Sequence, residues 1–272
     1  MTGTILITGT SSGLGRATAK LFQAKGWNVI ATMRDPASET ELTQLANTLV
    51  TRLDVQDAVS ITAAVVAGLA AFGRIDALVN NAGYGAYGPL ETTPLKSIRR
   101  QYDVNVLGLM ATTKALLPHF RANRSGTIVN ISSMGGRIAF PTGTLYHGTK
   151  FAVEGFSEAL QYELAPIGIR VKIVQPGMIN TDFSGRSFEY NNDPALVEYQ
   201  PLIQGMGDLV SSMKEHTSSP EAIAEVVYEA TTDESDRLRY IAGADAERFL
   251  AARDASDDAE FFAALKAQVG MV

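Results

Sequence analysis

Residues 4–25 read TILITGTSSGLGRATAKLFQAK and predict a strand, a glycine-rich turn and a helix in succession. Residues 4–8 are β-branched and aliphatic, residues 9–15 include three glycines, and residues 16–25 are amphipathic. The glycines let a ligand approach the backbone closely, and the start of the helix offers free N–H groups and a positive dipole end. We therefore expect this turn to hold a pyrophosphate group.

Strands and helices alternate along the chain after this turn. Short apolar runs predict strands at 28–33, 48–53, 75–80, 127–132, 170–175 and 237–242. Longer periodic segments predict helices at 58–72, at 94–121, from near Tyr146 to 165, from Pro220, and once or twice after Asp245. This order is typical of the α/β class: we expect one domain over 1–272, a doubly wound parallel (Rossmann) sheet with helices on both faces. Ligands of such sheets bind at the carboxyl ends of the strands.

The composition excludes several kinds of site. The chain has 272 residues, a net charge of -6 and no run of Lys and Arg, which argues against a nucleic-acid partner. It has no Cys, and its three His residues lack metal-ligand spacing, so no metal site is expected. No apolar run approaches the roughly 20 residues of a transmembrane helix. The N-terminus does not resemble a signal peptide, so a cytoplasmic location is expected.

Tyr146 and Lys150 are four residues apart and share one face of a predicted helix. A fixed positive charge favours the phenolate, which brings a tyrosine toward the range of a useful general acid or base. Ser133 follows a predicted buried strand, from which its hydroxyl can hold a carbonyl oxygen. The alternative is a chance pair of residues on a surface helix.

Two further polar residues have both a functional and a structural interpretation. Asn105 lies in an apolar stretch of a predicted helix, where it can distort the helix, hold a water, or be a hydrogen-bonded amide of the core. Arg34 follows Met33 at the end of the second strand, where dinucleotide sites often carry an acid. Its guanidinium suits the 2′-phosphate of NADP, whereas a solvated ion pair with Asp35 is the alternative.

Residues 183–219 have weak periodicity, and so long a weakly patterned segment is typical of a substrate lid. Residues 245–272 are expected to form a C-terminal helical extension. The segments expected near the substrate are mostly apolar or aromatic, which predicts a neutral, lipophilic carbonyl or secondary alcohol. These residues are Met134, Ile138, Phe140, Met178, Phe183, Phe188, Tyr190, Tyr199, Leu202, Met206 and Leu209. Arg137 and Arg186 are the cations close by in sequence.

The combined motifs resemble the short-chain dehydrogenase/reductase family over residues 4–181. They are Thr8-Gly9-x-x-x-Gly13-x-Gly15, Asn80-Asn81-Ala82-Gly83, Asn105, Ser133, Tyr146-x-x-x-Lys150 and Pro176-Gly177. Residues 135–141 and the long C-terminal part are similar to the branch with hydroxysteroid and retinol dehydrogenases and carbonyl reductases. The resemblance implies an NADP-dependent ketoreductase. It is also compatible with assembly of the chain into a homo-oligomer, either a dimer or a tetramer.

The resemblance also implies residue roles. Tyr146 would exchange a proton with the substrate oxygen, Ser133 would hydrogen-bond that oxygen, and Lys150 would lower the tyrosine pKa and bind the nicotinamide ribose. Asn105 would keep a water in the proton relay. Cofactor contacts are implied for Gly9, Ser11, Ser12, Gly13, Leu14, Gly15, Arg34, Asp54, Val55, Asn81, Ala82, Gly83, Tyr146, Lys150, Pro176, Gly177, Ile179 and Thr181.

Two other functions use the same fold. An epimerase or dehydratase could employ the same four catalytic residues, and net consumption of NADPH would distinguish it from a reductase. A non-catalytic dinucleotide-sensing regulator usually loses the tyrosine or the lysine, and this chain keeps both. The motifs therefore favour an enzyme.

Overall fold

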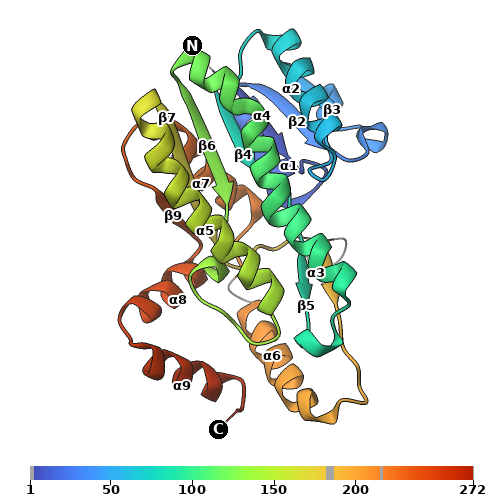
Figure 1. Ribbon diagram of the computed structural model, residues 1–272, viewed down its shortest axis with the longest axis vertical. Helices are drawn as coiled ribbons and strands as arrows, with labels where there is room; N and C mark the ends of the chain where they lie inside the picture. Colours follow the sequence, from blue (N-terminus) through green and yellow to red (C-terminus); the bar gives the residue numbers. More distant parts are fainter. Residues whose placement is uncertain (1–2, 182–186, 215–216, 272) are drawn as a thin grey trace.

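Seven parallel strands form the central sheet in the order β3-β2-β1-β4-β6-β7-β9 (Figure 1). The computed structural model describes residues 3–181, 187–214 and 217–271. The strands are β1 (Thr4–Thr8), β2 (Asn28–Met33), β3 (Thr48–Arg52), β4 (Ala77–Asn80), β6 (Gly126–Ile131), β7 (Ile169–Pro176) and β9 (Arg239–Ala242). The strand order reverses between β1 and β4, where doubly wound sheets open a crevice for ligands. The predicted Rossmann arrangement is confirmed.

Helices cover both faces of the sheet (Figure 1). Apolar residues of α1 (Gly13–Ala24) and α7 (Pro220–Thr232) pack on one face. Those of α2 (Ala58–Phe72), α4 (Gly108–Asn123) and α5 (Thr144–Leu164) pack on the other. Because both faces are buried, the strands read as continuous apolar runs rather than alternating patterns.

The predicted helix over 94–121 is interrupted. It consists of α3 (Leu95–Tyr102), a π-helical turn at Asp103–Leu107, and α4. Asn105 lies within the π turn, so the distortion that its polar side chain suggested is present. Such turns are frequent at functional sites.

The region proposed as a lid has more regular structure than its sequence pattern predicts. It contains β8 (Phe188–Tyr190), a 3₁₀ turn at Val197–Tyr199 and α6 (Gln200–Met213). The strand β8 pairs in parallel with β5 (Gly85–Tyr87), which the sequence did not reveal. Residues 182–186 and 215–216, with Phe183 and Arg186, lie outside the described part of the chain.

A third apolar cluster lies beyond the carboxyl ends of the strands. It joins α6 to the loop at Met134 and to two C-terminal helices, α8 (Ala244–Asp254) and α9 (Asp258–Gln268). Figure 1 shows these three helices below the sheet, away from α2 and β3. The predicted C-terminal helices therefore pack against α6 and the loop at Met134 beyond the carboxyl ends of the strands.

Within the described residues, no helix is long and apolar enough to cross a membrane. The same part of the chain contains no group of three or more His, Cys, Asp or Glu side chains arranged to hold a metal ion.

Candidate active site

The turn between β1 and α1 leaves room for a ligand because it carries glycines, and any side chain at these positions would occupy that space. Gly13 has a φ of +54°, and a Cβ on Gly15 would lie 2.3 Å from the Gly9 carbonyl oxygen. The Asn81 side-chain amide donates to the carbonyl oxygens of Thr8 and Gly9 at 2.8 and 3.1 Å. Asn81 thus fixes the turn from the end of β4, and the free N–H groups at the start of α1 suit a pyrophosphate.

Arg34 lies at the adenosine end of the predicted cofactor site. Its side chain is exposed, and it has no ion pair with any described residue. Asp35 accepts a hydrogen bond from the Ala37 N–H at 3.2 Å and so caps the following 3₁₀ turn. The alternative interpretation, an Arg34–Asp35 ion pair, is therefore wrong. Arg34 remains available to a ligand.

Ser133, Tyr146 and Lys150 meet near the carboxyl end of β6. Ser133 and Lys150 are both 9% exposed, and Tyr146 is partly buried. A hydrogen bond joins the side chains of Ser133 and Tyr146. The Lys150 ammonium donates to the Ile131 carbonyl oxygen at 2.9 Å and lies 5.6 Å from the centre of the Tyr146 ring. The three side chains thus lie close together, as the sequence predicted from the Tyr146–Lys150 spacing and from the position of Ser133 after a strand.

Burial shifts the pKa values of Tyr146 and Lys150. Burial raises the pKa of Tyr146, and the hydrogen bond with Ser133 only partly opposes that shift. Burial also lowers the pKa of Lys150 to about 8, against the attraction of Glu154. Burial thus decides the direction of the Tyr146 shift, and the lowering of the tyrosine pKa by Lys150 stays a prediction.

Asn105 is buried away from the cavity surface. Its Oδ1 accepts the Tyr84 N–H at 3.0 Å, and its Nδ2 donates to the Tyr84 carbonyl oxygen at 2.9 Å and to Thr149 at 3.2 Å. It is 3% exposed. The side chain is a fully hydrogen-bonded amide that ties the π turn to α5. Its role in a proton relay stays a prediction.

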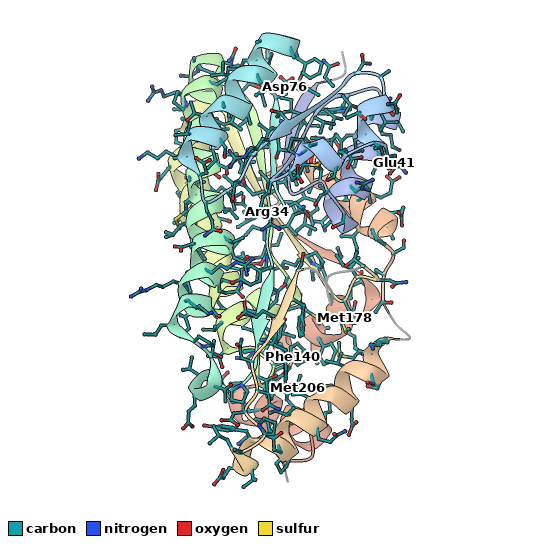
Figure 2. The ribbon with its side chains drawn as sticks, turned by 90° about the vertical axis from the view of Figure 1, so that its right-hand side faces the viewer. Arg34, Glu41, Asp76, Phe140, Met178 and Met206 are labelled. Atoms are coloured by element: carbon teal, nitrogen blue, oxygen red, sulfur yellow. The ribbon has the colours of Figure 1, made fainter. Side chains whose placement is uncertain are left out.

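One cavity of about 800 Å³ runs along the carboxyl ends of the strands. All eighteen residues for which cofactor contacts are implied line it, together with Ser133. On the substrate side it is lined by Met134, Phe140, Met178, Phe188, Tyr190, Met206 and Leu209. Figure 2 shows Arg34 at mid-height of the molecule and Met178, Phe140 and Met206 gathered below it. The cavity therefore has a polar end and an apolar end.

Sequence profiles identify the chain. The model of a family described as "short chain dehydrogenase" matches residues 3–192. The chain belongs to the short-chain dehydrogenase family. An uncharacterised oxidoreductase of Schizosaccharomyces pombe is 44% identical, over 88% of this chain and 100% of that protein. Human 17-beta-hydroxysteroid dehydrogenase type 1 is 31% identical, over 90% of this chain and 78% of that protein.

Solved structures agree with this assignment. A short-chain dehydrogenase from Streptomyces avermitilis is 35% identical and covers 100% of this chain and 98% of its own, with a TM-score of 0.84. ElxO with NADP bound is 28% identical, and the match covers 89% of this chain and 98% of the ElxO chain, with a TM-score of 0.73. This short-chain dehydrogenase is thus an oxidoreductase of a family that uses nicotinamide cofactors, and its relatives support a branch of the hydroxysteroid/retinol type.

Three residues expected at the substrate wall of this short-chain dehydrogenase lie elsewhere. Ile138 and Leu202 pack within the third apolar cluster. Tyr199 hydrogen-bonds the Glu91 carboxylate at 2.8 Å on the surface. Arg137 pairs with Asp254 at 2.6 Å and does not line the cavity. These residues are near the site in sequence, but their side chains do not line the cavity.

Two aromatic residues of the site were missed. The Tyr87 ring stacks between Tyr146 and Phe188, with both centroid distances 5.3 Å. The His147 Nδ1 hydrogen-bonds the Gly135 carbonyl oxygen at 3.0 Å, and its Nε2 accepts the Phe140 N–H at 3.1 Å. Burial lowers the pKa of His147. Its place inside the Tyr-x-x-x-Lys motif was the available signal, and it anchors the loop that forms one substrate wall.

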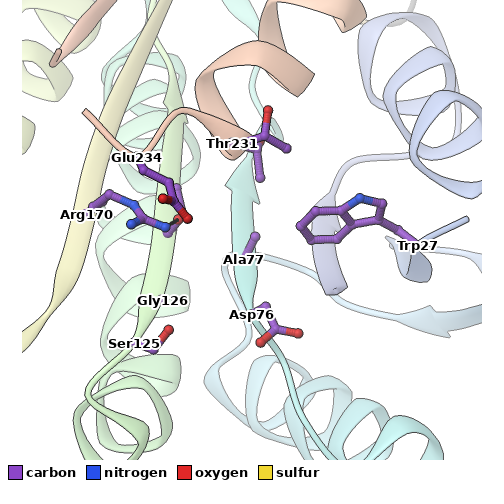
Figure 3. A pocket seen from close by; sticks show the side chains of 10 residues that line it. Trp27, Asp76, Ala77, Ser125, Gly126, Arg170, Thr231 and Glu234 are labelled. Atoms are coloured by element: carbon purple, nitrogen blue, oxygen red, sulfur yellow. Dashed lines mark hydrogen bonds between the residues drawn. The ribbon is translucent and has the colours of Figure 1, made fainter. Parts of the chain in front are cut away.

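A second cavity, of about 210 Å³, lies at the opposite edge of the sheet (Figure 3). Trp27, Asp76, Arg170 and Glu234 are among the residues around it, next to the amino ends of β4, β6 and β7. Arg170 donates to the Thr127 hydroxyl at 3.3 Å. None of the predicted site residues reaches this cavity, as expected for a sheet whose ligands bind at the other edge.

Proposed function

We propose that this short-chain dehydrogenase is an NADP-dependent ketoreductase that interconverts a lipophilic ketone and its secondary alcohol. The observation that carries the proposal is the meeting of Ser133, Tyr146 and Lys150 at the wall of one cavity. The same cavity extends to the glycine turn and Arg34 at one end and to an apolar wall at the other. A proton donor, a cofactor cradle and a substrate wall are thus contiguous.

The catalytic residues divide the work on the substrate oxygen. When bound, the nicotinamide cofactor supplies the hydride that reaches the carbonyl carbon. The Tyr146 hydroxyl gives its proton to the carbonyl oxygen, and the Ser133 hydroxyl donates a hydrogen bond to it. The raised pKa of Tyr146 keeps that proton in place at neutral pH, which suits a donor in the reductive direction. Lys150 is proposed to stabilise the tyrosinate that remains and to bind the nicotinamide ribose.

The preference for NADP rests on Arg34. A guanidinium can form charge-assisted, bidentate hydrogen bonds with a 2′-phosphate. Met33 precedes it and lines the cavity where an acid would repel that phosphate. The similarity to ElxO, whose structure contains NADP, supports the same choice.

The lipophilic substrate is supported by the side chains of the apolar wall. Phe140, Met178 and Met206 belong to one apolar cluster and also line the cavity. We propose that the region of β8 and α6 is the substrate lid within a single domain. The likeness to human 17-beta-hydroxysteroid dehydrogenase type 1 agrees with a large apolar ligand.

The test is a screen of NADPH oxidation against ketones graded by size and charge. We expect turnover with neutral aryl or polycyclic ketones and little with small or anionic ones. Steady consumption of NADPH by anionic ketones alone would reject the lipophilic pocket, and no consumption with any ketone would reject the reductase assignment.

A further inference from the structure

The family resemblance also implies that Ile179 and Thr181 hold the nicotinamide carboxamide. Residues 177–179 follow β7 and form the wall of the cavity at that point. This short segment is not part of a helix or a named strand. The Gly177 N–H donates to the Ala242 carbonyl oxygen at 3.0 Å, and the Ser218 N–H donates to the Met178 carbonyl oxygen at 2.9 Å. Its position therefore depends on contacts with residues that follow much later in the chain.

Asp245, in the first turn of α8, holds the same segment through its side chain. Its Oδ2 accepts the Met178 N–H at 2.7 Å. Its carboxylate also lies directly against Gly177, because a Cβ on that residue would be 2.0 Å from Oδ1. Glycine is required at 177 by lack of space, and the side chain that takes the space is Asp245.

Burial of the Asp245 carboxylate has a free-energy cost for folding. Asp245 is 2% exposed, and its Oδ1 has no hydrogen-bond partner among the described residues. The Met178 N–H and the start of α8 compensate the charge only in part. An apolar residue would fill a core position at lower cost. The contact with the Met178 backbone is what an apolar residue would not provide.

We propose that Asp245 is a positioning residue that fixes the backbone of residues 177–179 for the nicotinamide end of the cofactor. The inference rests on the proposed function, because it assigns the segment to the nicotinamide. Asp245 does not line the cavity, so it acts through Met178 and Gly177 rather than by touching the cofactor. Because Asp245 belongs to α8, it also couples the C-terminal helices, which pack against α6 and the loop at Met134, to cofactor binding.

The direct test is NADPH binding, measured by fluorescence titration, with kcat and the KM for NADPH measured alongside. Asp245→Ala removes the hydrogen bond to the Met178 N–H, and we expect the Kd for NADPH to rise by roughly tenfold. Asp245→Asn keeps one acceptor oxygen and should recover part of that loss. Glu247→Ala is the matched control, since Glu247 is an exposed acid in the same turn of α8, and it should bind NADPH normally.

A second pair of variants separates positioning from mere stability. Gly177→Ala places a methyl group against the carboxylate and should weaken NADPH binding. Combining it with Asp245→Ala removes the clash, so the double variant should bind NADPH more tightly than Gly177→Ala alone. NADPH affinity in Asp245→Ala equal to that of the unmodified protein overturns the inference. Where Asp245→Ala does not fold, Asp245→Asn replaces it, and an affinity equal to that of the unmodified protein overturns the inference there. Failure of the unmodified protein to bind NADPH overturns the proposed function itself, and this inference with it.

Discussion

The cofactor end and the substrate end of the cavity differ in how far apart in the chain their residues lie. The cofactor end uses short local motifs, in which Gly9–Gly15 sit between one strand and the next helix. The substrate end is lined by the loop at Met134 and by α6, which come from distant parts of the chain, and α8 and α9 pack behind them. The first end requires a fixed backbone and so leaves a recognisable pattern. The second requires only apolar volume, which many sequences can supply, and it leaves little pattern.

The largest expected effect is at Tyr146, where the two ends meet. Tyr146→Phe keeps the ring and removes the proton, so kcat should fall by about 10²–10⁴-fold while the Kd for NADPH hardly changes. Steady-state kinetics and a binding titration give both values. Tyr87→Phe is the matched control, because its ring stacks on Tyr146. Near-normal turnover in Tyr146→Phe would remove this residue from the mechanism.

A substrate series probes the apolar end alone. Buried apolar area contributes about 25 cal/mol per Å², so adding a phenyl-sized group should raise kcat/KM well beyond tenfold. The series runs from acetone-sized to aryl and polycyclic ketones at fixed NADPH. A flat or falling series would mean that the apolar side chains only pack the lid against the sheet.

The cofactor end is tested by Arg34→Ala. Loss of a charge-assisted hydrogen bond to the 2′-phosphate should reduce the preference for NADPH over NADH by about tenfold or more. The measurement is the ratio of kcat/KM for the two cofactors. Arg52→Ala is the control, since Arg52 is exposed on the adjacent strand and pairs with Asp57 at 2.9 Å. Equal use of both cofactors by the unmodified protein contradicts the assignment.

The smallest effect concerns the loop anchored by His147. Burial lowers the pKa of His147 below its ordinary value of 6.5, so the unfolded chain binds a proton more readily than the folded one. This contribution to stability is complete above about pH 6.5 and is lost as the pH falls toward the folded pKa. His147→Gln should therefore flatten the decline in Tm between about pH 6.5 and 5. His119→Gln is the control, and equal slopes in all three proteins would count against the anchor.

Local signals predicted much of the fold. The helix α2 has the predicted bounds, with an N-cap at Asp57 and a left-handed Gly73 after its end. Short β5 was missed because its partner β8 lies about a hundred residues later in the chain, and no local pattern records that pairing.

The site shows the same division. The spacing of Tyr146 and Lys150 predicted their proximity, because it depends only on helix geometry. It did not reveal the burial that raises the tyrosine pKa, because burial depends on the whole fold. Asp245 gave no signal, since its hydrogen bond to Met178 spans 67 residues.

In the proposed reaction, one cavity brings a hydride donor and the Tyr146 proton to the same carbonyl group. The most direct measurement uses NADPH that carries deuterium on the transferable position of the nicotinamide, with an aryl ketone as substrate and mass spectrometry of the product. We predict one deuterium on the carbinol carbon for each NADPH oxidised, and loss of this product in Tyr146→Phe. An alcohol without deuterium, or a changed substrate with no net oxidation of NADPH, would contradict the claim and favour an epimerase or a dehydratase.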